Sequence, residues 1–351
     1  MGIRLKGSCR LADCRASGSS FGYRLLLVAL ASCFLSVDVS TADDSQDRAA
    51  KILFNTASRL YRQENWSEAS AAFGRFLAAH PKHADAIEAR FARGYSLYRL
   101  KKFGDAEKDL SIASRDRGRT WSPDAANYLA RSLDALATAG GESRSLYRRA
   151  ADSYGSAASQ WTAARKKSPN AKRRDFDVKI AGAKAAQGES LYRSGDFTAA
   201  AAVLSSFLGS PLTPTTSSSQ YRGLYFLALS RYGTAASRNG SNDEAIQVLA
   251  RLTGSRFEKK ALWEEAAFLE ARLRQHAGEA EPARALYQRL AKSGRARAPE
   301  SAYYSALMDY ETGTEASLRS SQASFDAFVS RCTLSYSCSV GFLVWKYEVT
   351  P

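Results

Sequence analysis

Apolar and small residues recur along most of the chain at intervals of three and four, the spacing that places them on one face of an α-helix. Between residues 143 and 166, for example, Leu146, Tyr147, Ala150, Tyr154 and Trp161 form one such stripe. Few segments alternate apolar and polar residues as a half-buried strand does, and the chain contains only 8 prolines. The pattern therefore predicts an all-α protein.

One short pattern within these helical stretches occurs three times, at residues 57–69, 94–106 and 188–200. Each copy has a small residue, then Leu-Tyr-Arg, an aromatic residue four positions after the arginine, and an alanine three positions further on. This spacing predicts two antiparallel helices that cross closely at the small residues. The residues expected to pack these helix pairs are Ala57, Ala69, Phe73, Gly94, Phe103, Ala106, Gly188, Phe197 and Ala200.

A single helix pair cannot bury its apolar face alone, so the pairs are expected to stack into a solenoid. The pattern resembles the tetratricopeptide repeat, a helix–turn–helix unit of 34 residues. The resemblance implies a right-handed superhelical solenoid of stacked antiparallel helix pairs. Clear repeats are predicted at about 50–81, 87–118 and 181–211, and weaker pairs at other places in an array that spans residues 43–331.

The resemblance also implies a non-catalytic scaffold that binds a protein or peptide partner in a concave groove. In this family the first helix of each pair lines the groove. The positions that face it here are Tyr61, Arg62, Tyr95, Tyr98, Arg99, Tyr192 and Arg193. Tyrosine and arginine are typical of interface hot spots. The alternative interpretation is that the tyrosines pack between repeats and the arginines are only solvated.

Residues 1–42 have the features of an export signal. Several basic residues precede an apolar run from Leu25 to Val37, and small residues at Ser40, Thr41 and Ala42 suit cleavage after Ala42. Two alternatives remain open: lipidation of Cys33 within the sequence Leu-Ala-Ser-Cys, and an uncleaved anchor. All three predict an exported protein that is periplasmic or associated with the cell envelope, as a lipoprotein or in secreted form.

The last stretch, residues 332–351, changes from alanine-rich to β-branched and aromatic. A solenoid usually closes with a polar capping helix, and this stretch does not have the composition of one. One hypothesis is therefore that the chain is a fragment of a longer repeat protein.

The chain carries a formal net charge of +15. This charge predicts acidic partners, and it supports an alternative function as a charge-driven binder of anionic envelope polymer or membrane surface. Nucleic acid is an unexpected partner for an exported protein. One dense basic cluster surrounds Pro169: Arg165, Lys166, Lys167, Lys172, Arg173 and Arg174. Its simpler interpretation is a solvated loop between helices.

The sequence contains no pattern typical of catalysis, cofactor binding or metal binding. It lacks a P-loop, a dinucleotide fingerprint and a G-x-S-x-G motif. The three histidines have no partners at metal-ligand spacing, and no C-x-x-C pair occurs. We therefore expect neither enzymatic activity nor a metal or cofactor.

Overall fold

The computed structural model describes residues 38–210, 218–254 and 262–332. Within these ranges the chain forms fourteen α-helices and no strand, which confirms the predicted all-α solenoid. The helices are α2 Asp38–Arg62, α3 Trp66–Ala79, α4 Ala86–Arg99, α5 Phe103–Ala113, α6 Ser122–Ala139, α7 Arg144–Lys167, α8 Asn170–Arg193, α9 Phe197–Leu208, α10 Ser218–Arg238, α11 Asp243–Thr253, α12 Trp263–His276, α13 Ala280–Ala291, α14 Ala298–Thr312 and α15 Glu315–Cys332.

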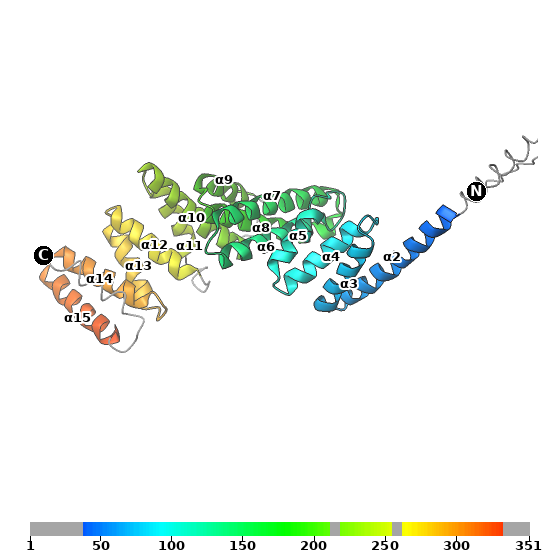
Figure 1. Ribbon diagram of the computed structural model, residues 1–351. Coiled ribbons are helices and arrows are strands. Elements are labelled where there is room, and N and C mark those ends of the chain that lie inside the picture. Colours follow the sequence, from blue (N-terminus) through cyan, green and yellow to red (C-terminus); the bar gives the residue numbers. More distant parts are fainter. Residues whose placement is uncertain (1–37, 211–217, 255–261, 333–351) are drawn as a thin grey trace, which may run out of the picture.

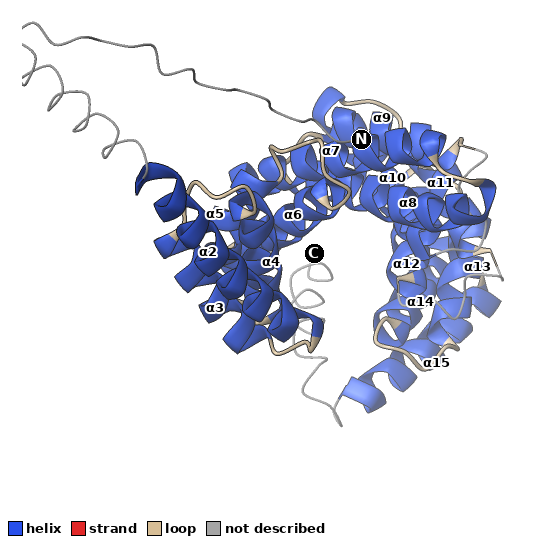
Figure 2. Ribbon diagram, turned by 90° about the vertical axis from the view of Figure 1, so that its right-hand side faces the viewer, coloured by secondary structure: helices blue, strands red, loops and turns tan. Residues whose placement is uncertain are grey.

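Consecutive helices pack against each other in pairs, and the pairs stack in chain order from α2–α3 to α14–α15 (Figure 1). The stack is curved rather than straight. Figure 2 shows α4, α6, α8, α12 and α14 along the inner side of the curve, and α5, α9, α11 and α13 along the outer side. Contacts between α2 and α4, α4 and α6, and α8 and α10 join first helices of successive pairs. First helices of successive pairs therefore meet at these three junctions along the inner face.

The core runs along the array instead of closing around one centre. Buried side chains gather in successive clusters, around Phe73 and Phe76 in the first pair, Trp161 in the middle, and Trp263 towards the C-terminal end. Many of the remaining buried residues are alanines, which let neighbouring helices approach closely. Each cluster is built by adjacent helices, so stability is expected to depend mainly on nearest neighbours.

Two glycines of the repeated pattern lie where helices cross. A Cβ atom on Gly94 would lie 2.8 Å from Cγ of Leu110, and one on Gly188 would lie 2.3 Å from Cγ of Leu204. Both leucines are fully buried. The leucine of the second helix therefore occupies the space that any larger residue on the first helix would need.

The turn inside a pair has the same backbone hydrogen bond in six places. After the first helix, one residue adopts the left-handed conformation, and the next backbone N–H donates to the carbonyl five residues earlier, as in a Schellman motif. These bonds are Asn65 N–H to Leu60 O, Lys102 N–H to Leu97 O, Glu142 N–H to Ala137 O, Asp196 N–H to Leu191 O, Gly240 N–H to Ala235 O and Glu279 N–H to Arg274 O, at 2.9–3.1 Å. The left-handed residues before them are Glu64, Lys101, Gly141, Gly195, Asn239 and Gly278. This shared turn sets the antiparallel geometry of each pair.

The helices α7 and α8, the last helix of the third pair and the first helix of the fourth, have 24 residues each, whereas α5, α9 and α11 have only 11 or 12. Only Ser168 and Pro169 separate α7 from α8. An X-Pro pair at this point ends one helix and starts the next because proline cannot continue α7. The basic cluster thus lies at the end of a long helical hairpin.

The first described helix, α2, begins at Asp38 and so includes the last five residues of the predicted export signal. The rest of that segment, including Cys33, lies outside the described residues, as does the tail 333–351. Among the described helices, none combines the length and apolarity needed to cross a membrane.

Candidate functional site

Four predicted groove residues of the first two pairs, Tyr61, Tyr95, Tyr98 and Arg99, form one network with Trp66 at the start of α3. The ring of Tyr61 lies 5.5 Å from Trp66 and 5.7 Å from Tyr95. The guanidinium of Arg99 lies 4.5 Å from the Trp66 ring centroid and donates to the Tyr95 hydroxyl at 3.1 Å. Burial, followed by the neighbouring Tyr95, raises the pKa of Tyr61 above its ordinary value. These side chains therefore pack across the repeat boundary and keep part of their surface in solvent.

The network continues into the third pair through Tyr128 on α6, a residue that we did not predict. Its ring lies 4.6 Å from Tyr95 and 5.1 Å from Tyr98. Burial, and then the nearby Tyr95, raises the pKa of Tyr128 to about 12. Nearby, Phe91 stacks on Trp121 at 5.0 Å between the same two helices. Aromatic pairs in this geometry add to the stability gained by burying their area.

The remaining predicted residues are placed differently. Tyr192 packs on Phe197 and Phe226, at 5.5 and 5.6 Å. Arg193 bonds to Glu189 on its own helix at 3.1 Å. Both line a second pocket of about 520 Å³, separate from the aromatic network. Arg62 is exposed and forms no hydrogen bond or ion pair with any other described residue.

Between these two groups, the inner face is hollowed into a pocket of about 670 Å³. We call it the inner pocket. Five helices line it: α4, α6, α7, α8 and α10. Of the predicted residues, only Tyr98 reaches it. The polar and aromatic side chains that line it are Tyr98, Asp124, Asn127, Tyr128, Arg131, Asp134, Tyr154, Trp161, Lys179, Ser218, Ser219 and Arg222.

The five of these residues that lie on α6 could have been found by extending the repeat register into that helix. The sequence Tyr-Ser-Leu-Tyr at 95–98 has a counterpart in Tyr-Leu-Ala-Arg at 128–131, with Tyr128 and Arg131 at the same three-residue spacing. Residues 123–168 are longer than one repeat of 34 residues, so the register does not extend through them by simple counting. The pocket residues on α8 and α10 carry no comparable signal.

The inner pocket contains a half-buried carboxylate, Asp134. Its two oxygens accept hydrogen bonds from the hydroxyls of Tyr154 and Ser190, both at 2.9 Å. Burial raises the pKa of Asp134 to about 6, and the hydroxyl hydrogen bonds and Arg222 oppose this effect while Glu189 adds to it. These bonds tie α6, α7 and α8 together at the pocket wall.

No constellation in the described residues matches a catalytic or metal centre. Groups of three or more histidine, cysteine, aspartate or glutamate side chains able to hold a metal ion are absent from them. The histidines His80 and His83 lie at a helix end beside Phe76, 5.9 and 5.6 Å from its ring. Asp134 has hydroxyl partners, and these are ordinary donors to a buried carboxylate.

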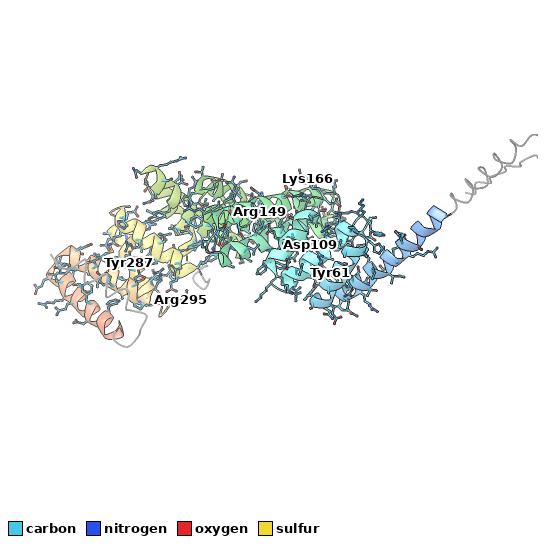
Figure 3. All side chains as sticks on the ribbon, in the orientation of Figure 1. Tyr61, Asp109, Arg149, Lys166, Tyr287 and Arg295 are labelled. Atoms are coloured by element: carbon cyan, nitrogen blue, oxygen red, sulfur yellow. The ribbon has the colours of Figure 1, made fainter. Side chains whose placement is uncertain are left out.

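The basic cluster lies at the α7–α8 turn, and Figure 3 shows Lys166 at the edge of this part of the array. Arg165 pairs with Asp177, and Arg173 donates to the Ser168 carbonyl at 3.2 Å. The other four cations are exposed, and none contacts a carboxylate of a described residue. They are Lys166, Lys167, Lys172 and Arg174.

The tetratricopeptide repeat family model matches residues 54–113 and 185–259. These two segments, which together cover less than half of the chain, are similar to tetratricopeptide repeats. The resemblance that the repeated pattern indicated is thus confirmed. Most residues that line the inner pocket fall in 124–183, between the two matched segments. The first segment contributes Tyr98, and the second contributes Ala185, Ala186, Ser218, Ser219 and Arg222.

Three solved structures illustrate the similarity to known proteins. The C-terminal part of a TPR repeat-containing protein from Cytophaga hutchinsonii is 17% identical, with 78% of this chain and 95% of that chain covered and a TM-score of 0.47. Acl4, an assembly chaperone of RpL4, is 15% identical, with coverages of 75% and 96% and a TM-score of 0.41. Yeast Tom70 is 14% identical, with coverages of 81% and 69% and a TM-score of 0.33. No curated protein has a significant sequence match. At these identities and scores, the similarity says nothing about partner or function.

Proposed function

We propose that this protein is a non-catalytic scaffold that binds a segment of a partner protein along its inner face. The observation that carries the proposal is the inner pocket, a concavity of about 670 Å³ at the centre of the curve. Three tyrosines and two arginines are among the side chains that line it. Such side chains provide rigid contact area and directional donors at protein interfaces. Tetratricopeptide repeats generally mediate protein–protein interaction, which is consistent with this proposal.

A photo-crosslinking experiment tests where the partner binds. Val178 lines the inner pocket and is 58% exposed, while Ile112 lies on the outer helix α5 and is 37% exposed. Each is replaced in turn by p-benzoylphenylalanine in the full-length chain, in cells that naturally produce the protein. We expect a discrete protein adduct from position 178 and none from position 112. Equal adducts from both positions, or adducts from position 112 alone, would move the interface off the inner face.

A second candidate function is binding to an anionic surface through the α7–α8 turn. The observation in its favour is the set of four exposed cations that have no carboxylate partner among the described residues. Binding to anionic vesicles should then fall steeply with salt, because such attraction is screened within a Debye length. Partner binding on the inner face, which uses apolar contacts as well, should depend on salt much less.

We also propose that the protein is exported to the periplasm or cell envelope. This proposal rests on the sequence of residues 1–42 and is independent of the inner face. Mass spectrometry of the mature N-terminus tests it. A first residue of Asp43 would support cleavage after Ala42, and a lipid-modified Cys33 would support a lipoprotein. An unprocessed Met1 in a cytoplasmic fraction would contradict export.

A further inference from the structure

A smaller pocket lies on the opposite side of α8 from the inner pocket. It has a volume of about 170 Å³ and is lined by residues of α7, α8 and the end of α9. We call it the edge pocket. Its four residues on α8 follow the spacing i, i+3, i+4 and i+7 of a single helix face. They are Asp177, Ile180, Ala181 and Lys184. The edge pocket and the inner pocket share no lining residue.

The wall of the edge pocket combines apolar side chains with polar groups that are already bonded. Ile180, Ala181 and Phe207 form its apolar part, and each is at least nine-tenths buried. The Arg165 guanidinium donates to both carboxylate oxygens of Asp177, so these two charges satisfy each other. Covering the remaining apolar wall with an apolar group from another molecule would remove that wall from water and favour binding.

Two lysines of the edge pocket are placed differently from Arg165. Lys166 and Lys184 line the pocket, and no carboxylate of the described residues lies within ion-pair distance of either. Both belong to the segment 165–184, which contains eight basic residues and only two acidic ones. One of these two carboxylates, Asp177, is already paired with Arg165. The surroundings of the pocket therefore carry a positive charge that favours an acidic ligand.

We propose that the edge pocket is a docking site for a short acidic segment of a partner protein. One apolar side chain of that segment enters between α7, α8 and α9, and its neighbouring carboxylates lie against Lys166 and Lys184. A cavity of about 150 Å³ accommodates a benzene ring, so a pocket of about 170 Å³ suits one side chain of the size of leucine or phenylalanine. Apolar anchors that fill pockets dominate the binding energy of many interfaces. This inference goes beyond the proposed function, because it concerns a second surface that is independent of the inner face.

The recess favours a protein segment over an anionic surface as the ligand at this place. A membrane or polymer surface attracts all the exposed cations of the turn through their charge alone, and it gains nothing from a recess between helices. An inserted side chain instead places its acidic neighbours beside the pocket. Docking therefore depends on Lys166 and Lys184 more than on Lys167 and Lys172, which lie on the same turn but do not line the pocket.

A peptide selection isolates ligands of this pocket. A random peptide library displayed on phage is enriched on the full-length wild-type chain and is then depleted on the double variant Lys166→Gln/Lys184→Gln. Peptides that bind the inner face bind both proteins and are removed, because the inner pocket is unchanged in the variant. We expect the remaining peptides to share one leucine, methionine or phenylalanine with aspartate or glutamate beside it.

A remaining peptide is then measured by fluorescence polarisation against three proteins: the wild type, the pocket variant Lys166→Gln/Lys184→Gln, and the control Lys167→Gln/Lys172→Gln, which loses the same charge. We expect the pocket variant to bind about 3- to 30-fold more weakly, the loss typical of two partly exposed ion pairs. The control should change binding less than about twofold, because charges that do not touch the peptide are screened. Replacing the apolar residue of the peptide by alanine should weaken wild-type binding about tenfold.

Each alternative outcome contradicts the docking site. Equal losses in the pocket variant and the control would show attraction by net charge alone, and would favour the anionic surface as the ligand of the turn. Unchanged binding after the alanine replacement, which needs no protein variant, would show that no side chain enters the pocket. If no peptide remained after depletion while circular dichroism showed intact helices in the variant, the inference would be wrong. Peptides that bind both proteins would leave the proposed function of the inner face standing.

Discussion

Arginine has two distinct roles in this molecule. Some arginines pair with buried carboxylates, and another is held by aromatic neighbours and has no such partner among the described residues. On the α4–α5 pair, Arg93 and Arg90 both bond to Asp109, whose side chain is only 2% exposed (Figure 3). Glu270 and Arg274 repeat this arrangement on α12. Such buried ion pairs hold helices in register, and removing one partner leaves the other charge buried and unpaired. Arg131, in contrast, is supported only by tyrosines, so its charge remains available at the inner face.

Titration of Asp134, which lines the inner pocket, makes the stability of the folded protein depend on pH. Its pKa is about 6 in the folded protein, against an ordinary value of 3.8, so between these values the folded state holds a proton that the unfolded chain has released. Its stabilising contribution is therefore fully present below about pH 4 and is lost as the pH rises through 6. The difference is at most about 3 kcal/mol.

We therefore expect Asp134→Asn, which is neutral at every pH, to remove this dependence. Between pH 5 and pH 7.5 the wild type should lose more thermal stability than Asp134→Asn, as measured by circular dichroism melting. Asp152→Asn, an exposed carboxylate on α7, serves as the control and should follow the wild type. If the melting temperatures of the wild type and Asp134→Asn changed equally with pH across this range, burial would not raise the pKa of Asp134 as described.

At the scale of the element, the left-handed position of the repeated turn is occupied by glycine in some pairs and by a residue with a Cβ in others. The left-handed position is glycine at Gly195 and Gly278 but lysine at Lys101, with φ values of 86°, 78° and 60°. A residue with a Cβ is destabilised by about 1–2 kcal/mol in this conformation. Glycine avoids this steric cost, but part of the advantage is offset because glycine loses more conformational freedom when the chain folds.

We expect Lys101→Gly to increase the free energy of unfolding by about 0.5–1 kcal/mol and so to raise the melting temperature. Gly195→Ala should decrease the free energy of unfolding by about 1 kcal/mol. Lys101 is exposed and its side chain forms no hydrogen bond or ion pair with a described residue, so the substitution should act through the backbone alone. Lys102→Gly, one position later and outside the left-handed region, is the matched control and should not stabilise. Equal effects at positions 101 and 102 would refute the backbone explanation.

The sequence revealed the helices and their packing more fully than the binding face. Gly94 and Gly188 stand out because an α-helix rarely carries glycine without a reason, and the leucines that fill the space beside them confirm close crossing. The inner pocket depends on residues from five helices, separated by up to 124 positions between Tyr98 and Arg222. Such a juxtaposition is set by the curvature of the stack, which no local pattern encodes. The unpaired state of Arg131 likewise depends on where every nearby carboxylate points.

At the scale of the whole molecule, the stacked pairs contact only their neighbours, so disturbance in one pair should not spread far. The helices α12 and α13 contact each other, α11 and α14, and have no strong contacts with α2–α5. In a linear array of this kind, total stability is close to a sum of repeat and interface terms. Local unfolding of one region is then possible while the rest stays folded.

Glu270→Gln tests this directly. Glu270 is buried, accepts from Arg274 Nε at 2.8 Å and from the Thr253 hydroxyl at 2.6 Å, and joins α11 to α12. Loss of its charge should destabilise this region by about 1.5–3 kcal/mol, because the charged hydrogen bond to Arg274 is weakened while Arg274 keeps its ion pair with Glu279. By hydrogen–deuterium exchange, we expect faster exchange in α11–α13 and unchanged exchange in α2–α5. Glu281→Gln, at an exposed pair on α13, is the control and should change neither region. A uniform increase across the described chain would instead show that the array unfolds as one cooperative unit.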